Sequence, residues 1–548
     1  MSDVALAPLG PLDLTGHFPQ PSYVDWLASV RRALRGGDLE TVLTWTPEAG
    51  LDLPTVVFSP DQVHFSEQTS EAVSSLRISH LLSQPRAAWP AEAAQALALG
   101  ADEVAVWTAD ASTLAALHEH VADRLRIYST TPPSRFESTW TPVVQPCGSF
   151  ESMHEASHVL IDGAVCFEAG ASASDALAWH LALAHCYLTQ RPDSAAPLAS
   201  CTLRVALSNR TLFDVARLEA TRRAFAQFFA AWGLDIEPTL HAVTSYRSQT
   251  ASDVHNNLVR AALQGVAAML GRTDVLTVRP YRAGDPEALR WALSLGHLLR
   301  SESHFGSGTH ASDAWWVSTA ADRLAAEAWT RFQAIESAGG FEAAWASSIG
   351  LAQIRSQHQR SVEALAMGAN VIIGTTRYVD TAPAESTALT HPPDVPRALE
   401  AGTTTHAIDR LSTTFEHLRS RGETGRAKRN LPPVVVLDLA PKRTAMQRQL
   451  ASDFFRMAGL EVLPIVHLDD TPLPTLLKVV CVVGEPEADD VRRALNHLES
   501  ERPGLLRYVV MEPTSLPPSL QPLVDDCLHG GMNRLELIHD LHLSLGLV

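Results

Sequence analysis

The sequence predicts an α/β protein that consists of a (β/α)8 barrel of the TIM type, followed by a smaller doubly wound domain and preceded by a helical arm. The chain has 548 residues, which is too long for a single hydrophobic core. From about residue 75 to 340, short apolar runs alternate with helical runs, as repeated βα units do. A second, shorter alternation of this kind begins near residue 431.

The composition is that of a globular protein, with 46% hydrophobic and 19% charged residues. The net charge of -18 argues against nucleic-acid binding, which needs clustered Lys and Arg. No apolar run reaches the length of a membrane span, and the first ten residues lack the layout of a signal peptide. The six cysteines are scattered without a C-x-x-C pair, which favours a reducing, cytoplasmic location over a disulfide framework or a cysteine metal site. We therefore expect a cytoplasmic protein with no nucleic-acid and no membrane partner.

Residues 1–55 are predicted to form the arm, with one short amphipathic helix. Trp26, Val30 and Leu34 repeat at helical spacing, and the glycine pair that follows stops the helix. Because such a helix buries little surface by itself, we expect it to pack on another body.

Residues 56–345 are predicted to form the barrel. The strand-like runs are LRISHLL (76–82), DEVAVWTAD (102–110), LRIYST (125–130), GAVCFEAG (163–170) and TLRVALS (202–208). The helical runs are PAEAAQALALG (90–100), with Pro at its start and Gly at its end, STLAALHEHVAD (112–123) and residues 211–234. In the last of these helices an apolar stripe is formed by Leu212, Val215, Leu218, Phe225, Phe228 and Trp232.

Residues 346–430 are predicted to form a helical and linker region. The segment 375–397 is rich in Thr, Pro and Ala, which is typical of a linker, and one helix is expected at about 398–420. The basic cluster RSRGETGRAKRN (419–430) is interpreted as a solvated linker.

Residues 431–548 are predicted to form a small flavodoxin-like domain. Its strands are PVVVLDL (433–439), EVLPIVHL (461–468), LKVVCVVG (477–484) and LRYVVME (506–512), with helices such as 444–460 between them. Asp438 stands at the end of the first strand, at the edge where such sheets bind cofactors. The loop that follows has no glycine, no histidine and no phosphate cradle, so the domain offers no binding chemistry there.

Several segments in this order resemble the methylmalonyl-CoA mutase family. They are FEAGASASDALAWHLALA (167–184), 246–281 with Asn257 and Arg260 in an Asn-x-x-Arg spacing, 299–344, GANVIIGTTRY (368–378) and the arm. The resemblance implies the barrel and C-terminal domain described above. It also implies radical rearrangement of acyl-CoA carbon skeletons on adenosylcobalamin.

The cobalamin half-site of that family is Asp-x-His-x-x-Gly after the first strand of the C-terminal domain. Asp438 matches the acid, but Ala440 stands in place of the histidine that binds cobalt, and Arg443 in place of the glycine. The later contact loop is represented here by VGEPEADD (483–490), which is acidic and unlike the family's Ser-rich loop. The resemblance therefore implies that this chain binds no cofactor of its own.

The chain also differs from the family's mid-barrel motif at the residues that would carry chemistry. Gly163, Glu168, Ala169 and Gly170 match it, whereas Ala164 and Val165 replace the Tyr that steers the cofactor radical and the His that hydrogen-bonds the thioester. Neither replacement can donate a hydrogen bond to a developing oxyanion. The family's Asp-Pro-x-Gly-Gly-Ser loop is replaced by THASDAWW (309–316).

These losses make the chain resemble the small, non-catalytic subunits of heterodimeric members. The resemblance implies no catalytic, cofactor or metal residue in this chain, and a large catalytic subunit as partner that holds adenosylcobalamin and is wrapped by the arm. The alternative is an acyl-CoA-handling barrel enzyme that acts without a cobalamin site of its own. Bulky side chains along the barrel axis would favour the first hypothesis, and an open channel lined by Ser and Thr would favour the second.

Other candidate residues have plain structural explanations. His154, Glu155 and His158 match the zinc-protease pattern H-E-x-x-H, but chance explains the match better in a chain with 23 histidines. His304 and His310 lie near a predicted strand end, where a polar rim loop is the simpler interpretation. The remaining candidates are polar residues that either contact substrate or serve caps and turns, namely Asn256, Asn257, Arg260 and Asp438. Glu168 is a retained polar residue to which the sequence assigns no role.

Overall fold

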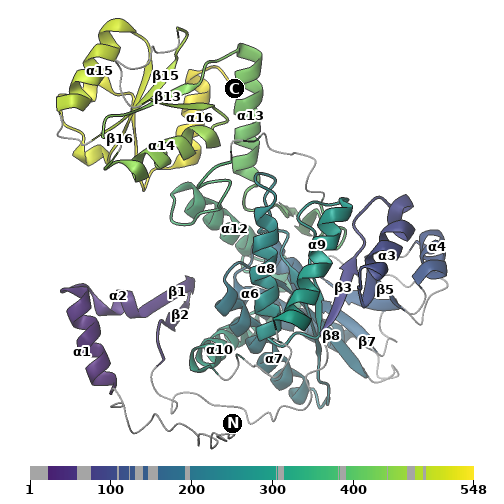
Figure 1. Ribbon diagram of the computed structural model, residues 1–548. Coiled ribbons are helices and arrows are strands. Elements are labelled where there is room, and N and C mark those ends of the chain that lie inside the picture. Colours follow the sequence, from purple (N-terminus) through teal and green to yellow (C-terminus); the bar gives the residue numbers. More distant parts are fainter. Residues whose placement is uncertain are drawn as a thin grey trace, which may run out of the picture.

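The computed structural model describes residues 22–57, 76–107, 110–121, 124–129, 140–145, 158–191, 198–303, 305, 311, 314–380, 382, 391–440, 442–465, 475–484 and 489–547. Figure 1 shows the barrel, a separate α/β domain joined to it through one long helix, and an N-terminal arm. Among the described residues, no helix is long and apolar enough to cross a membrane.

Eight parallel strands form a closed barrel in the order β10-β3-β4-β5-β6-β7-β8-β9, which confirms the predicted fold class. The strands are β3 (Arg77–Leu81), β4 (Glu103–Trp107), β5 (Leu125–Ser129), β6 (Trp140–Val144), β7 (His158–Asp162), β8 (Ser200–Leu207), β9 (Thr239–Thr244) and β10 (Val275–Thr277). The helices among and after them are α3 (Trp89–Ala98), α4 (Ala111–Val121), α5 (Ala164–Glu168), α6 (Ala173–Gln190), α7 (Thr211–Ala231), α8 (Asn256–Leu270), α9 (Pro286–His297), α10 (Trp315–Ser337), α11 (Gly340–Trp345) and α12 (Leu351–Ala366).

The apolar stripe predicted for α7 is buried only along its middle. Val215, Leu218, Phe225 and Phe228 are in the core, whereas Leu212 and Trp232 at the two ends are exposed. Helix α7 packs on both α8 and α10, and its middle turns supply the buried part of the stripe.

Three sequence-based assignments of local structure are wrong. The predicted strand 163–170 is not a strand, because β7 ends at Asp162 and residues 164–168 form helix α5. The predicted helix 398–420 begins only at Thr413, and residues 398–407 form a hairpin of β11 (Ala398–Ala401) and β12 (Thr404–Ala407). The segment directly before Ser303 is not a strand, because α9 runs into a π-helical turn at Leu298–Glu302. The segment 163–170 is buried throughout and apolar apart from Glu168, and such a run satisfies both periodicities, so tertiary packing decides between them.

The arm contains the predicted helix α1 (Tyr23–Leu34), then α2 (Leu39–Leu43) and a hairpin of β1 (Thr44–Glu48) and β2 (Leu51–Pro54). The hairpin is anchored on the barrel: Leu51 and Leu53 are buried in its largest core cluster. Glu48 accepts hydrogen bonds from the backbone of Ala173 and Ser174 at the start of α6, at 2.6 and 2.9 Å. Helix α1 buries no residue and lies apart from the barrel (Figure 1).

Helix α13 (Thr413–Arg429) connects the barrel mouth with the C-terminal domain (Figure 1). The basic cluster 419–430 lies on this helix, so the predicted linker is helical here, and residues 427–430 at its end are exposed to solvent. One face of α13 packs tightly, because a Cβ at Gly422 would lie 1.8 Å from the carbonyl oxygen of Ala458. At its start, Glu416 accepts a hydrogen bond from the backbone of Ala251, a barrel loop residue, at 2.7 Å.

The C-terminal domain is a five-stranded parallel sheet with the order β14-β13-β15-β16-β17, the doubly wound arrangement that the sequence predicts. The strands are β13 (Val434–Asp438), β14 (Val462–Ile465), β15 (Val479–Val483), β16 (Leu506–Val510) and β17 (Asp526–Leu528). The helices are α14 (Ala445–Met457), α15 (Asp489–Glu501) and α16 (Arg534–Ser544). The order of strands reverses at β13, so Asp438 lies at the switch point of the sheet.

Candidate functional site at the mouths of the barrel and the C-terminal sheet

The axis of the barrel is crossed by side chains from opposite strands. Strands β4 and β8 stand four places apart in the eight-stranded ring and therefore face each other across the axis. The guanidinium carbon of Arg204 on β8 lies 4.8 Å from the ring centroid of Trp107 on β4. This cation–π contact closes the axis at the level of the strand ends.

A second crossing lies beside the first, because Tyr128 is the register partner of Trp107 and His241 that of Arg204. Strands β5 and β9 also stand opposite each other, and the rings of Tyr128 and His241 are 6.5 Å apart. The Tyr128 ring packs on Trp107 at 5.0 Å, and His241 Nε2 shares a hydrogen bond with the Thr277 hydroxyl at 2.8 Å. Burial raises the pKa of the Tyr128 phenol and lowers that of His241 well below its ordinary value, so both side chains are neutral.

The amino-terminal end of the barrel is closed by an ionic cluster. Glu103 is buried and contacts Arg77 at 3.1 Å and Arg126 at 3.5 Å. The two arginines are partly exposed, so they close the floor while their charges reach water.

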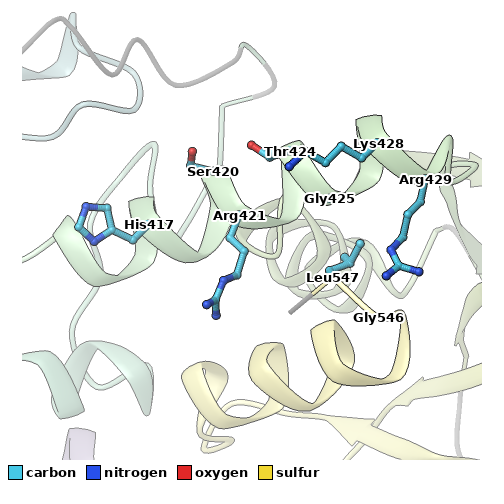
Figure 2. A pocket seen from close by; sticks show the side chains of 9 residues that line it. All are labelled: His417, Ser420, Arg421, Thr424, Gly425, Lys428, Arg429, Gly546 and Leu547. Carbon is cyan, nitrogen blue, oxygen red and sulfur yellow. The ribbon is translucent and has the colours of Figure 1, made fainter.

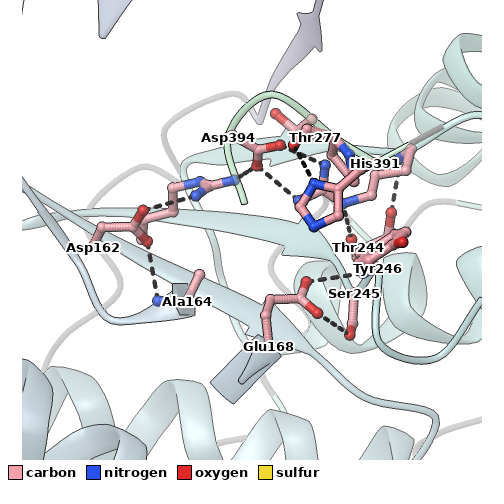
Figure 3. Close-up of polar contacts among 12 residues, drawn as sticks. Asp162, Ala164, Glu168, Thr244, Ser245, Tyr246, Thr277, His391 and Asp394 are labelled. Carbon is pink, nitrogen blue, oxygen red and sulfur yellow. Dashed lines mark hydrogen bonds and ion pairs between the residues drawn. The ribbon is translucent and has the colours of Figure 1, made fainter. Parts of the chain in front are cut away.

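The mouth of the barrel holds a buried network of two arginines and two aspartates (Figure 3). Arg279 binds Asp394 with both terminal nitrogens, at 2.8 and 2.7 Å. Arg204 donates to Asp162 at 3.0 Å and also contacts Asp394. The Arg279 Nε donates to the Thr244 carbonyl at 2.8 Å, which fixes the plane of the guanidinium group. The four charges sum to zero, which is the condition for burying them together.

Burial governs the titration of this network. It raises the pKa of the Asp162 carboxyl, and the neighbouring Arg204 only partly offsets this effect. It lowers the pKa of Arg279 to about 10, which leaves that side chain charged at neutral pH. Burial thus works against the charged form of both groups, and the ion pairs between the arginines and the aspartates offset part of this effect.

Ala164 and Val165 lie where β7 gives way to α5, and both are buried. The backbone N–H of Ala164 donates to Asp162 at 3.1 Å, and the Ala164 and Val165 side chains offer no polar atom (Figure 3). A hollow lined by the preceding residue Gly163, by His180 and by Arg217 among others, but by neither Ala164 nor Val165, has a volume of about 20 Å³. That volume is the room of one water molecule.

Glu168 has a structural role that the sequence does not reveal. It accepts hydrogen bonds from the Ser245 hydroxyl and the backbone of Tyr246 and Arg247, at 2.9, 2.9 and 2.8 Å (Figure 3). It thereby holds the loop after β9 in place.

Asn257 and Arg260 also bind the chain itself. Asn257 exchanges two hydrogen bonds of 2.9 Å with the backbone of Thr250, and Arg260 donates to Asn257 at 2.8 Å and to the Ile373 carbonyl at 2.8 Å. Asn256 donates to Asp253 at 2.5 Å. These contacts support the interpretation as loop and helix-start residues.

The histidine candidates do not assemble a metal site in the described part of the chain. His158 is the first residue of β7, where its two ring nitrogens contact the hydroxyls of Ser200 and Thr202. His154, Glu155, His304 and His310 lie outside the described residues. Within the described residues there is no group of three or more His, Cys, Asp or Glu side chains that could hold a metal ion.

The mouth of the C-terminal sheet is formed around Asp438, which is buried. Its carboxylate accepts hydrogen bonds from the Ala440 backbone at 3.2 Å and the Thr444 hydroxyl at 2.5 Å, and pairs with Arg448 at 2.7 Å. These contacts close the turn and start the next helix, which is the plain explanation offered by the sequence. Ala440 is half-buried and Arg443 is exposed.

A further hollow lies away from both mouths, between α13 and the end of α16 (Figure 2). It has a volume of about 550 Å³, and its lining includes Arg421, Lys428 and Arg429. The Arg429 guanidinium lies against Gly546, directly after α16, where cations complement a helix carboxyl terminus.

The sequence did not identify Trp107, Arg204, Arg279 or Asp394 as parts of one site. Arg204 and Trp107 lie on predicted strands, where strict alternation places every second side chain inside the barrel. Asp394 belongs to a segment that has the composition of a linker, so no local signal marks it.

Fold and site together define a (β/α)8 barrel protein with a doubly wound C-terminal domain, in which buried side chains fill the barrel axis. The family model described as methylmalonyl-CoA mutase matches residues 116–416, which is more than half of the chain. The chain belongs to the methylmalonyl-CoA mutase family.

Individual relatives agree with this assignment. A probable methylmalonyl-CoA mutase small subunit from Mycobacterium tuberculosis is 28% identical over 326 residues, covering 56% of this chain and 50% of the relative. The small subunit from Porphyromonas gingivalis is 26% identical over 275 residues, covering 47% and 43%. A large subunit from Streptomyces virginiae is 28% identical over 252 residues, covering 42% and 33%. The chain thus matches about half the length of its small-subunit relatives and resembles them.

Proposed function

We propose that this chain is the small, non-catalytic subunit of an adenosylcobalamin-dependent methylmalonyl-CoA mutase. In this proposal it stabilises a large catalytic subunit, which interconverts methylmalonyl-CoA and succinyl-CoA. The observation that carries the proposal is the closed barrel axis, where Arg204 meets Trp107 and Tyr128 meets His241 from opposite strands.

A CoA ester that threads the barrel would have to displace buried, mutually bonded side chains. The Arg204 guanidinium would also lose its partners Asp162 and Asp394. Leaving buried carboxylates without a cation costs several kcal/mol per ion. The axis is therefore filled by bulky side chains, and this favours the subunit over the alternative of an acyl-CoA-handling barrel enzyme.

The C-terminal domain supports the cofactor part of the proposal. Alanine at position 440 offers no ligand for cobalt, and Asp438 is already bonded to Thr444 and Arg448. In the family that acid orients the cobalt-binding histidine, so here its hydrogen-bonding capacity serves a turn. The residues present do not fit a cobalamin lower ligand, and we place the cofactor in the partner.

The first test compares isomerase activity of the chain alone and with the large subunit, in the presence of adenosylcobalamin. We expect no succinyl-CoA from the isolated chain, full activity with the partner, and a longer half-life of the partner at elevated temperature when this chain is bound. Turnover by the isolated chain would overturn the non-catalytic assignment.

The second test concerns the arm. Removing residues 1–37 deletes α1 but leaves the hairpin that anchors the arm, because β1 and β2 begin only at Thr44. Since α1 buries nothing on its own barrel, we expect unchanged thermal stability and loss of co-purification with the large subunit. Retained pairing by this variant would refute the role of α1.

A further inference from the structure

Asp394 lies in a segment that crosses the barrel mouth, and we call residues 391–397 the strap. His391 packs on the Tyr246 ring at 5.0 Å, and Val395 is buried in the main core cluster. Asp394 is only 1% exposed. The strap therefore places the Asp394 carboxylate at the barrel mouth, although it follows the last barrel strand by more than a hundred residues.

The contacts of this carboxylate have the geometry with which proteins recognise a free carboxylate ligand. Arg279 forms a two-pronged pair with both carboxylate oxygens, and Arg204 approaches Asp394 Oδ2 from the opposite side of the group. Such paired, charge-assisted hydrogen bonds are the strongest mode of carboxylate recognition.

The two arginines are held in place without help from Asp394. Arg279 is fixed by its hydrogen bond to the Thr244 carbonyl, and Arg204 by Asp162 and by the Trp107 ring. They converge on one point at the carboxyl-terminal end of the strands, which is where barrels of this type bind ligands. A preformed cation pair of this kind retains its preference for an anion when the anion is removed.

We propose that Arg204 and Arg279 form a carboxylate-binding site and that Asp394 is its built-in occupant. Without the Asp394 side chain, the site takes up a small free carboxylate of the size of formate or acetate. The strap thus closes the mouth, because its own Asp394 side chain occupies the carboxylate site.

The test uses the full-length chain with Asp394→Ala, which removes a carboxylate and leaves a space that matches formate. We expect a melting temperature several degrees below that of the parent, and partial recovery in sodium formate but not in sodium chloride of equal ionic strength. Asp394→Gly enlarges the space by one carbon, so acetate should then match or exceed formate.

Three controls make the outcome specific. Asp394→Asn keeps the site filled, so it should lose stability without any response to formate. Asp394→Ala combined with Arg279→Met removes the site and should not respond either. Asp438→Ala deletes a buried carboxylate that has a single arginine partner, and its response to formate should equal its response to chloride.

If formate shifts Asp394→Ala no more than it shifts Asp438→Ala, the proposal is overturned. If Asp394→Ala does not fold during expression, refolding yields in formate and chloride replace melting temperatures. A higher yield in formate supports the site, and equal yields in the two salts overturn it.

Discussion

The mouths of the barrel and of the C-terminal sheet are closed in different ways. In the barrel, the axis and mouth are filled by large side chains and a four-charge network. In the C-terminal domain, Asp438 is folded back onto its own turn, and the residues beside it are small or exposed. The comparison teaches that one mouth is occupied, whereas the other simply has no ligand groups.

The two regions should therefore respond differently to substitution. A filled, charged mouth is coupled to the stability of the whole barrel. A turn at a sheet edge affects only its surroundings. All twelve tryptophans lie between residues 26 and 345, so tryptophan fluorescence reports on the barrel region and not on the C-terminal domain.

The largest expected effect is that of Arg204→Met. The substitution leaves Asp162 buried without its cation and Asp394 with one arginine, so we expect a loss of about 3–5 kcal/mol in the free energy of unfolding. Arg448→Met also removes the partner of a buried aspartate, but the Arg448 side chain is 36% exposed, and we expect only about 1 kcal/mol. Chemical denaturation measures both losses, followed by tryptophan fluorescence for Arg204→Met and by circular dichroism for Arg448→Met. Equal losses in the two variants would remove the distinction between the regions.

A second prediction concerns acid. Burial lowers the pKa of His180 and of His358 to about 4, against an ordinary value near 6.5. The unfolded chain binds these protons first as the pH falls, so the stabilisation is complete above about pH 6.5 and is lost progressively down to about pH 4.

The expected slope is about 1.4 kcal/mol per pH unit for each such histidine. His180→Gln keeps a donor for the Ile161 carbonyl and removes one titrating group. The slope of the free energy of unfolding against pH should therefore fall by about 1.4 kcal/mol per pH unit. Burial also lowers the pKa of three further histidines in the barrel region, His158, His241 and His391. In the C-terminal domain it lowers the pKa of His542. Barrel fluorescence should therefore change at a higher pH than a probe in the C-terminal domain. Simultaneous transitions would contradict this reasoning.

The smallest expected effect is that of Ala440→His in the C-terminal domain. The new imidazole would find Asp438 already bonded to Thr444 and Arg448, and Arg443 stands where the family has glycine. We expect no uptake of cobalamin, measured by its visible absorption after gel filtration, and little change in stability. A cobalamin spectrum that comigrates with this variant would show that the site lacks only its histidine.

The fold could be predicted largely because it repeats. Alternating apolar and helical runs gave both domains, and Gly36, Pro90 and Gly100 marked element ends. The sequence could not predict the network at the barrel mouth. Asp162, Arg204, Arg279 and Asp394 are far apart in the chain, and their pairing depends on barrel closure. The role of Glu168 was hidden for the same reason, since its partners begin 77 residues later.

The position of Asp394 in the chain also has a consequence for biosynthesis. The last barrel strand ends at Thr277, but the carboxylate that neutralises Arg279 is synthesised 115 residues after that arginine. At ordinary rates of translation this delay is on the order of 10 s. During this interval a nascent barrel has only Asp162 to balance the two arginines. The mouth therefore cannot reach its final packing until the strap leaves the ribosome.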